Sequence, residues 1–207
     1  MNFEHTEEQR QLADSLNKYL AANYGFEQRK AILQSASGLS DAVWTAFAEM
    51  GLTALALPEE DGGFGGGALD LMAAMEACGR ALVVEPLLDH IALGTRLVAR
   101  AGSAAQRAAW LPGAIDGSVK LAFAGLEPGR RYELAPAVTI AKRNGAGYVL
   151  SGEKAVVVDA ASATRLIVSA RSNEGPSLFL VDPAQPGVAL NPCRTIDGQR
   201  AADVTLS

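Results

Sequence analysis

Residues 114–126 read AIDGSVKLAFAGL, and within them the hydrophobic pattern of the chain changes. Before Gly117, apolar residues recur at intervals of three and four, which is the spacing of one face of a helix. After Gly117 they form a continuous run to Leu126 and then several short runs separated by turn residues, which is typical of strands. The sequence therefore predicts an α+β protein with a helical first part and a strand-rich second part.

The helical part carries recognisable start and stop signals. Thr6 with Gln9 has the spacing of a capping box, in which two side chains satisfy backbone donors at the start of a helix, and Ser103–Gln106 repeats it. Glycine tends to end helices and proline suits a first turn. We therefore expect helices from Thr6, from Ser40 or Asp41 to Gly51, from Leu69 to Leu82, after Pro86, and from Ser103 to about Ile115. The helix from Leu69 to Leu82 carries Leu69, Met72, Ala73, Glu76 and Leu82. The apolar faces expected for the helices at Thr6, at Ser40 or Asp41, and after Pro86 are Leu12, Leu16, Tyr19 and Leu20; Val43, Trp44, Phe47 and Met50; and Leu87, Leu88, Ile91 and Leu97.

The second part contains closely spaced strand candidates. Residues 143–147, RNGAG, form a hairpin-type turn between two of them. Short strands punctuated by turns predict an antiparallel β-barrel or sandwich. Because helices come first and strands afterwards, we expect two domains, residues 1–117 and 118–207. The strand candidates are 119–126, 138–142, 148–150, 155–158, 166–170, 177–181, 188–190 and 204–206.

Composition excludes several classes of protein. The 207 residues carry 18 Lys and Arg against 23 Asp and Glu, a net charge of −5, so there is no basic field for nucleic acid. The two cysteines cannot form a disulfide framework, and no Cys/His cluster has metal-ligand spacing. No apolar stretch reaches the ~20 residues of a membrane span, and the acidic N-terminus is not a signal peptide. We expect a cytoplasmic protein.

Few residues point to chemistry by themselves. The glycine-rich stretch 58–67 could cradle a phosphate, but without a surrounding strand–GxGxxG–helix unit an inter-helix loop is favoured. Its carboxylates Glu59, Glu60 and Asp61 are interpreted as solvated. Arg130 and Arg131 flank a turn, where they could bind phosphate or simply belong to the surface. Structural roles are favoured for four other residues, namely Trp44, Trp110, Cys78 and His90.

Four stretches, taken together, resemble the acyl-CoA dehydrogenase family. They span nearly the whole chain at consistent spacing, which is more specific than any one of them alone. Within the family, Phe26–Arg29 and the turn from Glu127 to Tyr132 are most similar to the small subunit of pimeloyl-CoA dehydrogenase. The four stretches are FEHTEEQ (3–9); LPEEDGG (57–63) with MEACGR (75–80); LAFAGLEPG (121–129); and GAGYVLSGEK (145–154).

The resemblance implies a helical domain, a β-barrel domain and FAD against the barrel wall. Members of this oxidoreductase family convert an acyl-CoA thioester to the 2-enoyl-CoA: a glutamate removes the α-proton while the β-hydrogen leaves as hydride to the flavin. The resemblance further implies fatty acid metabolism, electron-transfer flavoprotein or a similar acceptor, and a homo- or hetero-oligomer. In the family a C-terminal helical bundle follows the barrel and carries the glutamate. That bundle is absent here, so we expect the catalytic base beyond Ser207 and name no catalytic residue.

The resemblance also assigns candidate site residues. The cofactor candidates are Phe123, Ala124, Leu126, Val156, Val157 and Val158, and the substrate candidates are Arg131 and Tyr132. Leu126 replaces the family's threonine, which removes a hydrogen bond of roughly 0.5–1.5 kcal/mol. Val156–Val158 replace a motif with a stacking tryptophan, whose aromatic contact contributes about 0.5–1.5 kcal/mol beyond burial. These two changes are expected to weaken FAD binding. They do not abolish it, because the backbone donors of both segments do not depend on side-chain identity.

Three functional hypotheses follow. The first is part of an FAD-dependent acyl-CoA dehydrogenase, inactive alone. The second is a non-catalytic small subunit of a hetero-oligomeric acyl-CoA dehydrogenase, with weak or no FAD binding, which Leu126 and Val156–Val158 favour. The third is an interaction or scaffold module, suggested by the missing bundle.

Overall fold

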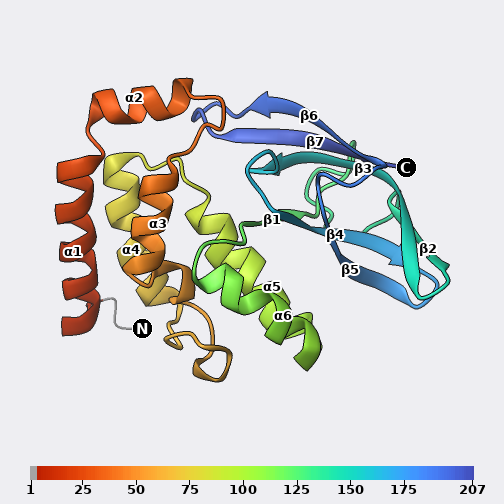
Figure 1. Ribbon diagram of the computed structural model, residues 1–207, viewed down its shortest axis with the longest axis horizontal. Helices are drawn as coiled ribbons and strands as arrows, with labels where there is room; N and C mark the ends of the chain where they lie inside the picture. Colours follow the sequence, from red (N-terminus) through yellow and green to blue (C-terminus); the bar gives the residue numbers. More distant parts are fainter. Residues whose placement is uncertain (1–3) are drawn as a thin grey trace. The chain divides into compact units, whose positions relative to one another are not determined.

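The computed structural model describes residues 4–207, so Phe3, at the start of the first resembling stretch, lies outside the described residues. The chain forms two compact units that meet between Ser118 and Val119, one residue after the boundary expected from the sequence. Helices make up the first unit and strands the second (Figure 1). A helical domain followed by a curled β-sheet domain is therefore confirmed.

The helical unit begins with the predicted capping box. The Gln9 N–H donates to Thr6 Oγ1 at 3.3 Å, and the Thr6 N–H donates to Gln9 Oε1 at 3.0 Å. Ser40 rather than Asp41 caps the second predicted helix through the Val43 N–H. The helices are α1 (Glu7–Asn23), α2 (Phe26–Gln34), α3 (Asp41–Glu49), α4 (Ala68–Ala81), α5 (Arg96–Ala101) and α6 (Ala104–Ile115), with short turns η1 (Leu52–Ala54), η2 (Glu59–Asp61) and η3 (Asp89–Thr95).

The core of this unit lies between α1, α3 and α4. The core residues that α1 and α3 contribute lie on the apolar faces predicted from the sequence. Helix α4 packs against α1. The chief buried side chains are Leu16, Leu20, Val43, Trp44, Phe47, Leu52, Ala74, Ala77, Leu87 and Ile91. Trp44 also donates its indole N–H to the Gly117 carbonyl at 2.8 Å, so its predicted structural role is confirmed.

Three details of the helical unit differ from the prediction. Helix α2 was not expected, and none of its residues is buried, so it leaves little hydrophobic periodicity in the sequence. The small residues of α4, not Leu82 and Glu76, face the core, because alanines let α1 approach closely. Leu88 is 53% exposed although Leu87 and Ile91 are buried, and a π-helical turn, η3, begins at the next residue.

The second unit is one curled sheet that does not close (Figure 1). Its order is β1-β4-β2-β3-β7-β6, and β5 pairs with the other edge of β4. The expected hairpin is present, with β2 and β3 joined through Gly145 and Ala146. The strands are β1 (Leu121–Ala124), β2 (Ile140–Asn144), β3 (Gly147–Val158), β4 (Arg165–Ser172), β5 (Gly175–Val181), β6 (Val188–Arg194) and β7 (Arg200–Leu206).

The sheet is mixed rather than wholly antiparallel, which corrects the predicted strand arrangement. β1 runs parallel to β4 from Leu121↔Arg165 to Ala124↔Val168, and β2 meets β4 in the same sense at Ile140↔Arg171. Parallel neighbours need a long connection, and here β2 and β3 lie between β1 and β4 in the sequence. β5 and β6 are the two ends of the sheet, so the predicted barrel is a half-barrel.

Candidate functional site

The predicted cofactor residues lie on two neighbouring segments of the sheet unit. Phe123 and Ala124 belong to β1, Leu126 follows it, and Val156–Val158 end β3. The two segments are joined directly, because the Ala155 N–H donates to the Leu126 carbonyl at 2.9 Å. The structure therefore brings the two predicted groups side by side.

These residues divide by exposure. Ala124 and Val157 are buried, and Phe123 and Val158 are half-buried. Leu126 and Val156 are 37% and 47% exposed, so each segment presents one large aliphatic side chain to solvent. We call Leu126 and Val156 the aliphatic shelf. The Leu126 N–H donates no hydrogen bond within residues 4–207.

A β-bulge gives Val156 its exposure. The pairing of β3 with β7 shifts between Lys154 and Val157. At the bulge Val156 has φ +49°, a conformation that is costly for a β-branched residue, on the order of 1–3 kcal/mol. Its N–H donates to Asp203 Oδ1 at 2.9 Å, which holds the bulge in place. The strained residue thus belongs to the predicted site.

Glu127 and Lys154, close in the chain to the two shelf residues, form a buried ion pair that our sequence analysis missed. Lys154 Nζ is 3.1 Å from Glu127 Oε1 and donates to Ser169 Oγ at 3.0 Å. Lys154, Glu127 and Ser169 are 0%, 3% and 5% exposed. One signal was available: Lys154 occupies the same period-two face of its strand as Leu150, which predicts an inward-facing lysine that needs a partner.

Glu127 also organises the loop that precedes β2. Its two carboxylate oxygens accept the N–H groups of Ala137, Val138 and Thr139 at 2.8–2.9 Å. Burial by itself opposes the charged form of Glu127, but these backbone donors outweigh it and hold the pKa at about 2. Burial lowers the pKa of Lys154, and the adjacent Glu127 carboxylate opposes that shift.

The predicted substrate residues lie on an exposed loop. Tyr132 is 93% exposed, and Arg131 is exposed with φ +49°. The neighbouring Arg130 forms an ion pair with Glu133. Within residues 4–207, no hydrogen bond, ion pair or ring contact joins Arg131 or Tyr132 to the aliphatic shelf, so their substrate role stays a prediction.

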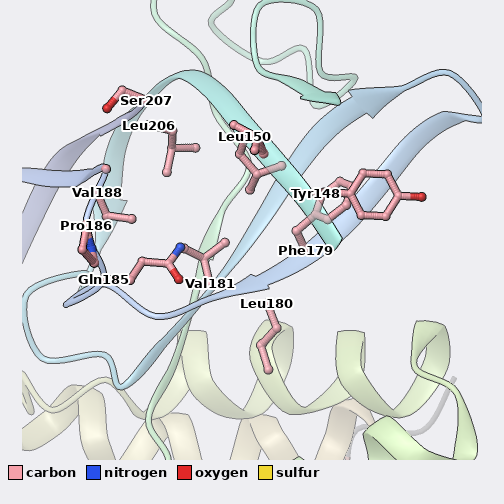
Figure 2. A pocket seen from close by; sticks show the side chains of 12 residues that line it. Tyr148, Leu150, Phe179, Leu180, Val181, Gln185, Pro186, Val188, Leu206 and Ser207 are labelled. Atoms are coloured by element: carbon pink, nitrogen blue, oxygen red, sulfur yellow. The ribbon is translucent and has the colours of Figure 1, made fainter. Parts of the chain in front are cut away.

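An open cavity of about 400 Å³ lies inside the curl of the sheet (Figure 2). Leu150, Val181 and Leu206 point into it and continue the apolar core of this unit. The rings of Tyr148 and Phe179 meet edge to face at its rim, 5.0 Å apart. None of the predicted site residues lines the cavity, so it is separate from the shelf.

The glycine-rich stretch of the helical unit is a hydrogen-bonded loop. The Gly65 N–H donates to the Leu57 carbonyl at 2.7 Å. A Cβ on Gly63 would lie 2.2 Å from that same carbonyl oxygen, so close backbone approach explains the glycine. Asp61 pairs with Arg107 at 3.4 Å and is not simply solvated, whereas Glu59 and Glu60 are exposed.

His90 and Cys78, for which a structural role was predicted, are both buried. His90 is fully buried, with Nε2 2.9 Å from the Ala114 carbonyl and its ring edge-on to Trp44. Cys78 is buried, and burial raises the pKa of its thiol to about 12, as expected for an inert cysteine. Trp110 is half-buried. Sequence reasoning missed the buried Glu85, whose carboxylate accepts the Tyr24 hydroxyl at 2.6 Å.

In residues 4–207, no three His, Cys, Asp or Glu side chains gather as metal ligands do. Across the same residues, no helix combines the length and apolar character that crossing a membrane demands.

Family comparisons match both units. The family model described as "Acyl-CoA dehydrogenase, N-terminal domain" matches residues 6–118, and "Acyl-CoA dehydrogenase, middle domain" matches residues 122–206. Acyl-CoA dehydrogenase FadE12 of Mycobacterium tuberculosis is 32% identical over 200 residues, covering 92% of this chain and 50% of its own length. The chain thus spans about half the length of that curated relative.

Solved structures share the fold. The Tcur3481-Tcur3483 steroid ACAD G363A variant is 34% identical with a TM-score of 0.87, over 97% of this chain and 55% of that one. The ChsE4-ChsE5 complex from Mycobacterium tuberculosis is 26% identical with a TM-score of 0.88, over 100% and 56%. An acyl-CoA dehydrogenase complexed with FAD from Bacillus anthracis is 25% identical with a TM-score of 0.87, over 99% and 36%.

Proposed function

Because this chain belongs to the acyl-CoA dehydrogenase family, we propose that it contributes the FAD-binding wall and the helical domain to an enzyme that oxidises an acyl-CoA to the 2-enoyl-CoA. The aliphatic shelf carries this proposal. It joins the two segments that the family resemblance assigns to the cofactor, and it pairs exposed apolar surface with the unengaged N–H of Leu126.

The residues present fit a flavin ring through apolar contact and backbone hydrogen bonding. Leu126 and Val156 would cover part of one ring face, and the Leu126 N–H would donate to a ring heteroatom. When bound, FAD supplies the acceptor for the hydride that leaves the acyl β-carbon. The buried Val157 and Ala124 would hold the shelf from behind, and Arg131 and Tyr132 remain our candidates for contact with the acyl-CoA.

The finer features of the reaction are also proposals. We expect the α-proton to be removed by a glutamate beyond Ser207, since we assign no base within residues 4–207. Electron-transferring flavoprotein or a similar carrier is the proposed electron acceptor, and fatty acid metabolism in the cytoplasm is the proposed setting. The resemblance to the pimeloyl-CoA dehydrogenase small subunit suggests a dicarboxylic acyl chain.

Flavin retention tests the proposal. The purified chain is mixed with FAD, freed of excess by gel filtration and scanned for absorbance near roughly 450 nm. Val156→Glu places a charge on the shelf and should abolish retention. Val149→Glu is the matched control, because Val149 is 46% exposed on the same strand but lies away from the shelf. A wild-type chain that takes up no FAD contradicts the proposal.

A second candidate is a non-catalytic subunit that supports a flavin-bearing partner chain. Its support is the aliphatic Leu126 and Val156–Val158, where the family has a threonine and a tryptophan, and the hetero-complex ChsE4-ChsE5 among its structural relatives. Co-expression with a full-length acyl-CoA dehydrogenase chain tests it. Under this candidate the partner requires this chain for activity while the flavin remains with the partner. Full activity of the partner alone excludes it.

A further inference from the structure

Three consecutive residues after β1 are each held by a different hydrogen bond. The Gly125 carbonyl accepts the Ser169 hydroxyl at 3.3 Å, and the Leu126 carbonyl accepts the Ala155 N–H at 2.9 Å. Glu127 Oε1 accepts Lys154 Nζ at 3.1 Å. We call these three contacts the clamp. Its donors come from adjacent residues of β3 and from β4.

The members of the clamp are linked to one another. Lys154 Nζ donates to both Glu127 Oε1 and Ser169 Oγ, so the ammonium group connects the first contact to the third. Lys154 precedes Ala155, so its side chain and the next N–H hold successive residues of the facing segment. Lys154, Glu127 and Ser169 are each at most 5% exposed. A buried charge without its partner is strongly unfavourable, so the arrangement resists partial opening.

The clamp contacts lie next to both shelf residues in the chain. Leu126 lies between Gly125 and Glu127, which are held by the side chains of Ser169 and Lys154. Val156 directly follows Ala155, whose N–H donates to the Leu126 carbonyl. The main chain at both shelf residues is therefore fixed by Lys154, Glu127 and Ser169. These three side chains are buried, so they cannot touch a ligand seated on the shelf.

We propose that Lys154, Glu127 and Ser169 are positioning residues that set the Leu126 N–H and the Val156 bulge for flavin binding. This inference rests on the proposed function. The chain lacks the threonine hydroxyl and the tryptophan ring expected from the family, so correct placement of backbone and aliphatic groups has more influence on affinity here.

Ser169→Ala provides the sharpest test because it removes the link between Lys154 and Gly125 but leaves the ion pair. FAD affinity should fall about tenfold, the effect of one hydrogen bond of ~1.4 kcal/mol. Ser172→Ala is the matched control, since Ser172 lies on the same strand and its hydroxyl bonds only at the β4–β5 turn. Its FAD affinity should equal that of the wild type. Lys154→Met should weaken binding further, and its visible flavin circular dichroism should change.

Amide hydrogen exchange in the flavin-free chain separates the possible failures. Ser169→Ala should speed exchange at the amides of Ala155 and Val156, which donate to the Leu126 carbonyl and to Asp203, and Ser172→Ala should not. Unchanged exchange there, or unchanged FAD affinity alongside a wild type that binds FAD, overturns the inference and leaves the proposed function standing. A wild type that binds no FAD overturns the proposed function and the inference with it.

Discussion

Glu85 in the helical unit and Glu127 in the sheet unit are 4% and 3% exposed, yet their pKa values move in opposite directions. Glu85 accepts the neutral Tyr24 hydroxyl at 2.6 Å and the Ser40 N–H at 3.1 Å. Within residues 4–207 no lysine or arginine pairs with it. Burial therefore prevails and raises the pKa of Glu85.

The difference shows that the balance between burial and the donors around a carboxylate decides its charge. Glu127 accepts three backbone N–H groups, and these outweigh the effect of its burial. Around Glu85 the hydrogen bonds from Tyr24, Ser40 and nearby backbone groups do not outweigh burial. The sheet unit thus holds a fixed ion pair, whereas the helical unit holds a carboxyl whose proton is more tightly bound than in water.

Lys154→Met should produce the largest loss. It leaves the Glu127 carboxylate buried without its cation, and such losses reduce the free energy of unfolding by about 3–5 kcal/mol. Urea unfolding followed by circular dichroism measures the change. Lys142→Met is the control, because Lys142 is an exposed lysine of the same unit, and it should stay within about 0.5 kcal/mol of the wild type. Equal values for the two variants would mean that the buried Glu127 carboxylate does not depend on its ion pair with Lys154.

Tyr24→Phe should have the next largest effect. The Tyr24 hydroxyl donates to Glu85 and accepts the Val84 N–H at 3.1 Å, so its removal leaves two buried groups short of a partner. We expect a loss of about 1–3 kcal/mol in the free energy of unfolding, measured in urea. Tyr19→Phe is the control, since no side-chain hydrogen bond of Tyr19 is present in residues 4–207. A loss of the same size in both variants would assign the effect to tyrosine packing.

Much of the fold was predictable because local signals set it. The capping boxes at Thr6 and Ser103 and the turn at Gly145 depend only on neighbouring residues, and each has the predicted geometry. The parallel pairing of β1 with β4 depends on residues more than forty positions apart, such as Leu121 and Arg165, and no local pattern reports it. Helix α2 was also not predictable from a local pattern, because none of its residues is buried and the sequence therefore shows no apolar face there.

The candidate site was predictable only in part, for a related reason. Leu126 and Val156 could be assigned by resemblance, and the structure places their segments together. The pairing of Glu127 with Lys154 across 27 positions could not be read from local patterns. Each residue alone has the character of a surface charge. Only the inward period-two position of Lys154 hinted at its burial.

The two glutamates should also respond to pH in opposite windows. The pKa of Glu85 is raised above its ordinary 4.5, so its contribution to stability is complete below that pH and is lost as pH rises through its folded value. The pKa of Glu127 is lowered to about 2, so its contribution is present above about 4.5 and is lost as pH falls toward 2.

Glu85→Gln and Glu127→Gln test these windows through the pH dependence of the unfolding midpoint. Glu85→Gln should remove a decline in stability above pH 4.5, by about 1.4 kcal/mol for each unit by which the pKa is raised. Glu127→Gln should remove part of the loss of stability that the wild type shows as pH falls from about 4.5 toward 2. Above pH 4.5 the difference in stability between this variant and the wild type should not change with pH. Identical pH profiles for the two variants would mean that both carboxyls experience the same environment.

Ser40→Ala should have the smallest effect and sharpens the account of Glu85. The Ser40 hydroxyl caps α3 by accepting the Val43 N–H at 3.3 Å, whereas its backbone N–H donates to Glu85. Alanine removes the cap and keeps that N–H, so we expect a loss of about 1 kcal/mol in the free energy of unfolding. The decline above pH 4.5 should persist unchanged, because the donors to Glu85 remain. A flattened decline would instead mean that the cap orients the Ser40 N–H, so that the pKa of Glu85 depends on the start of α3.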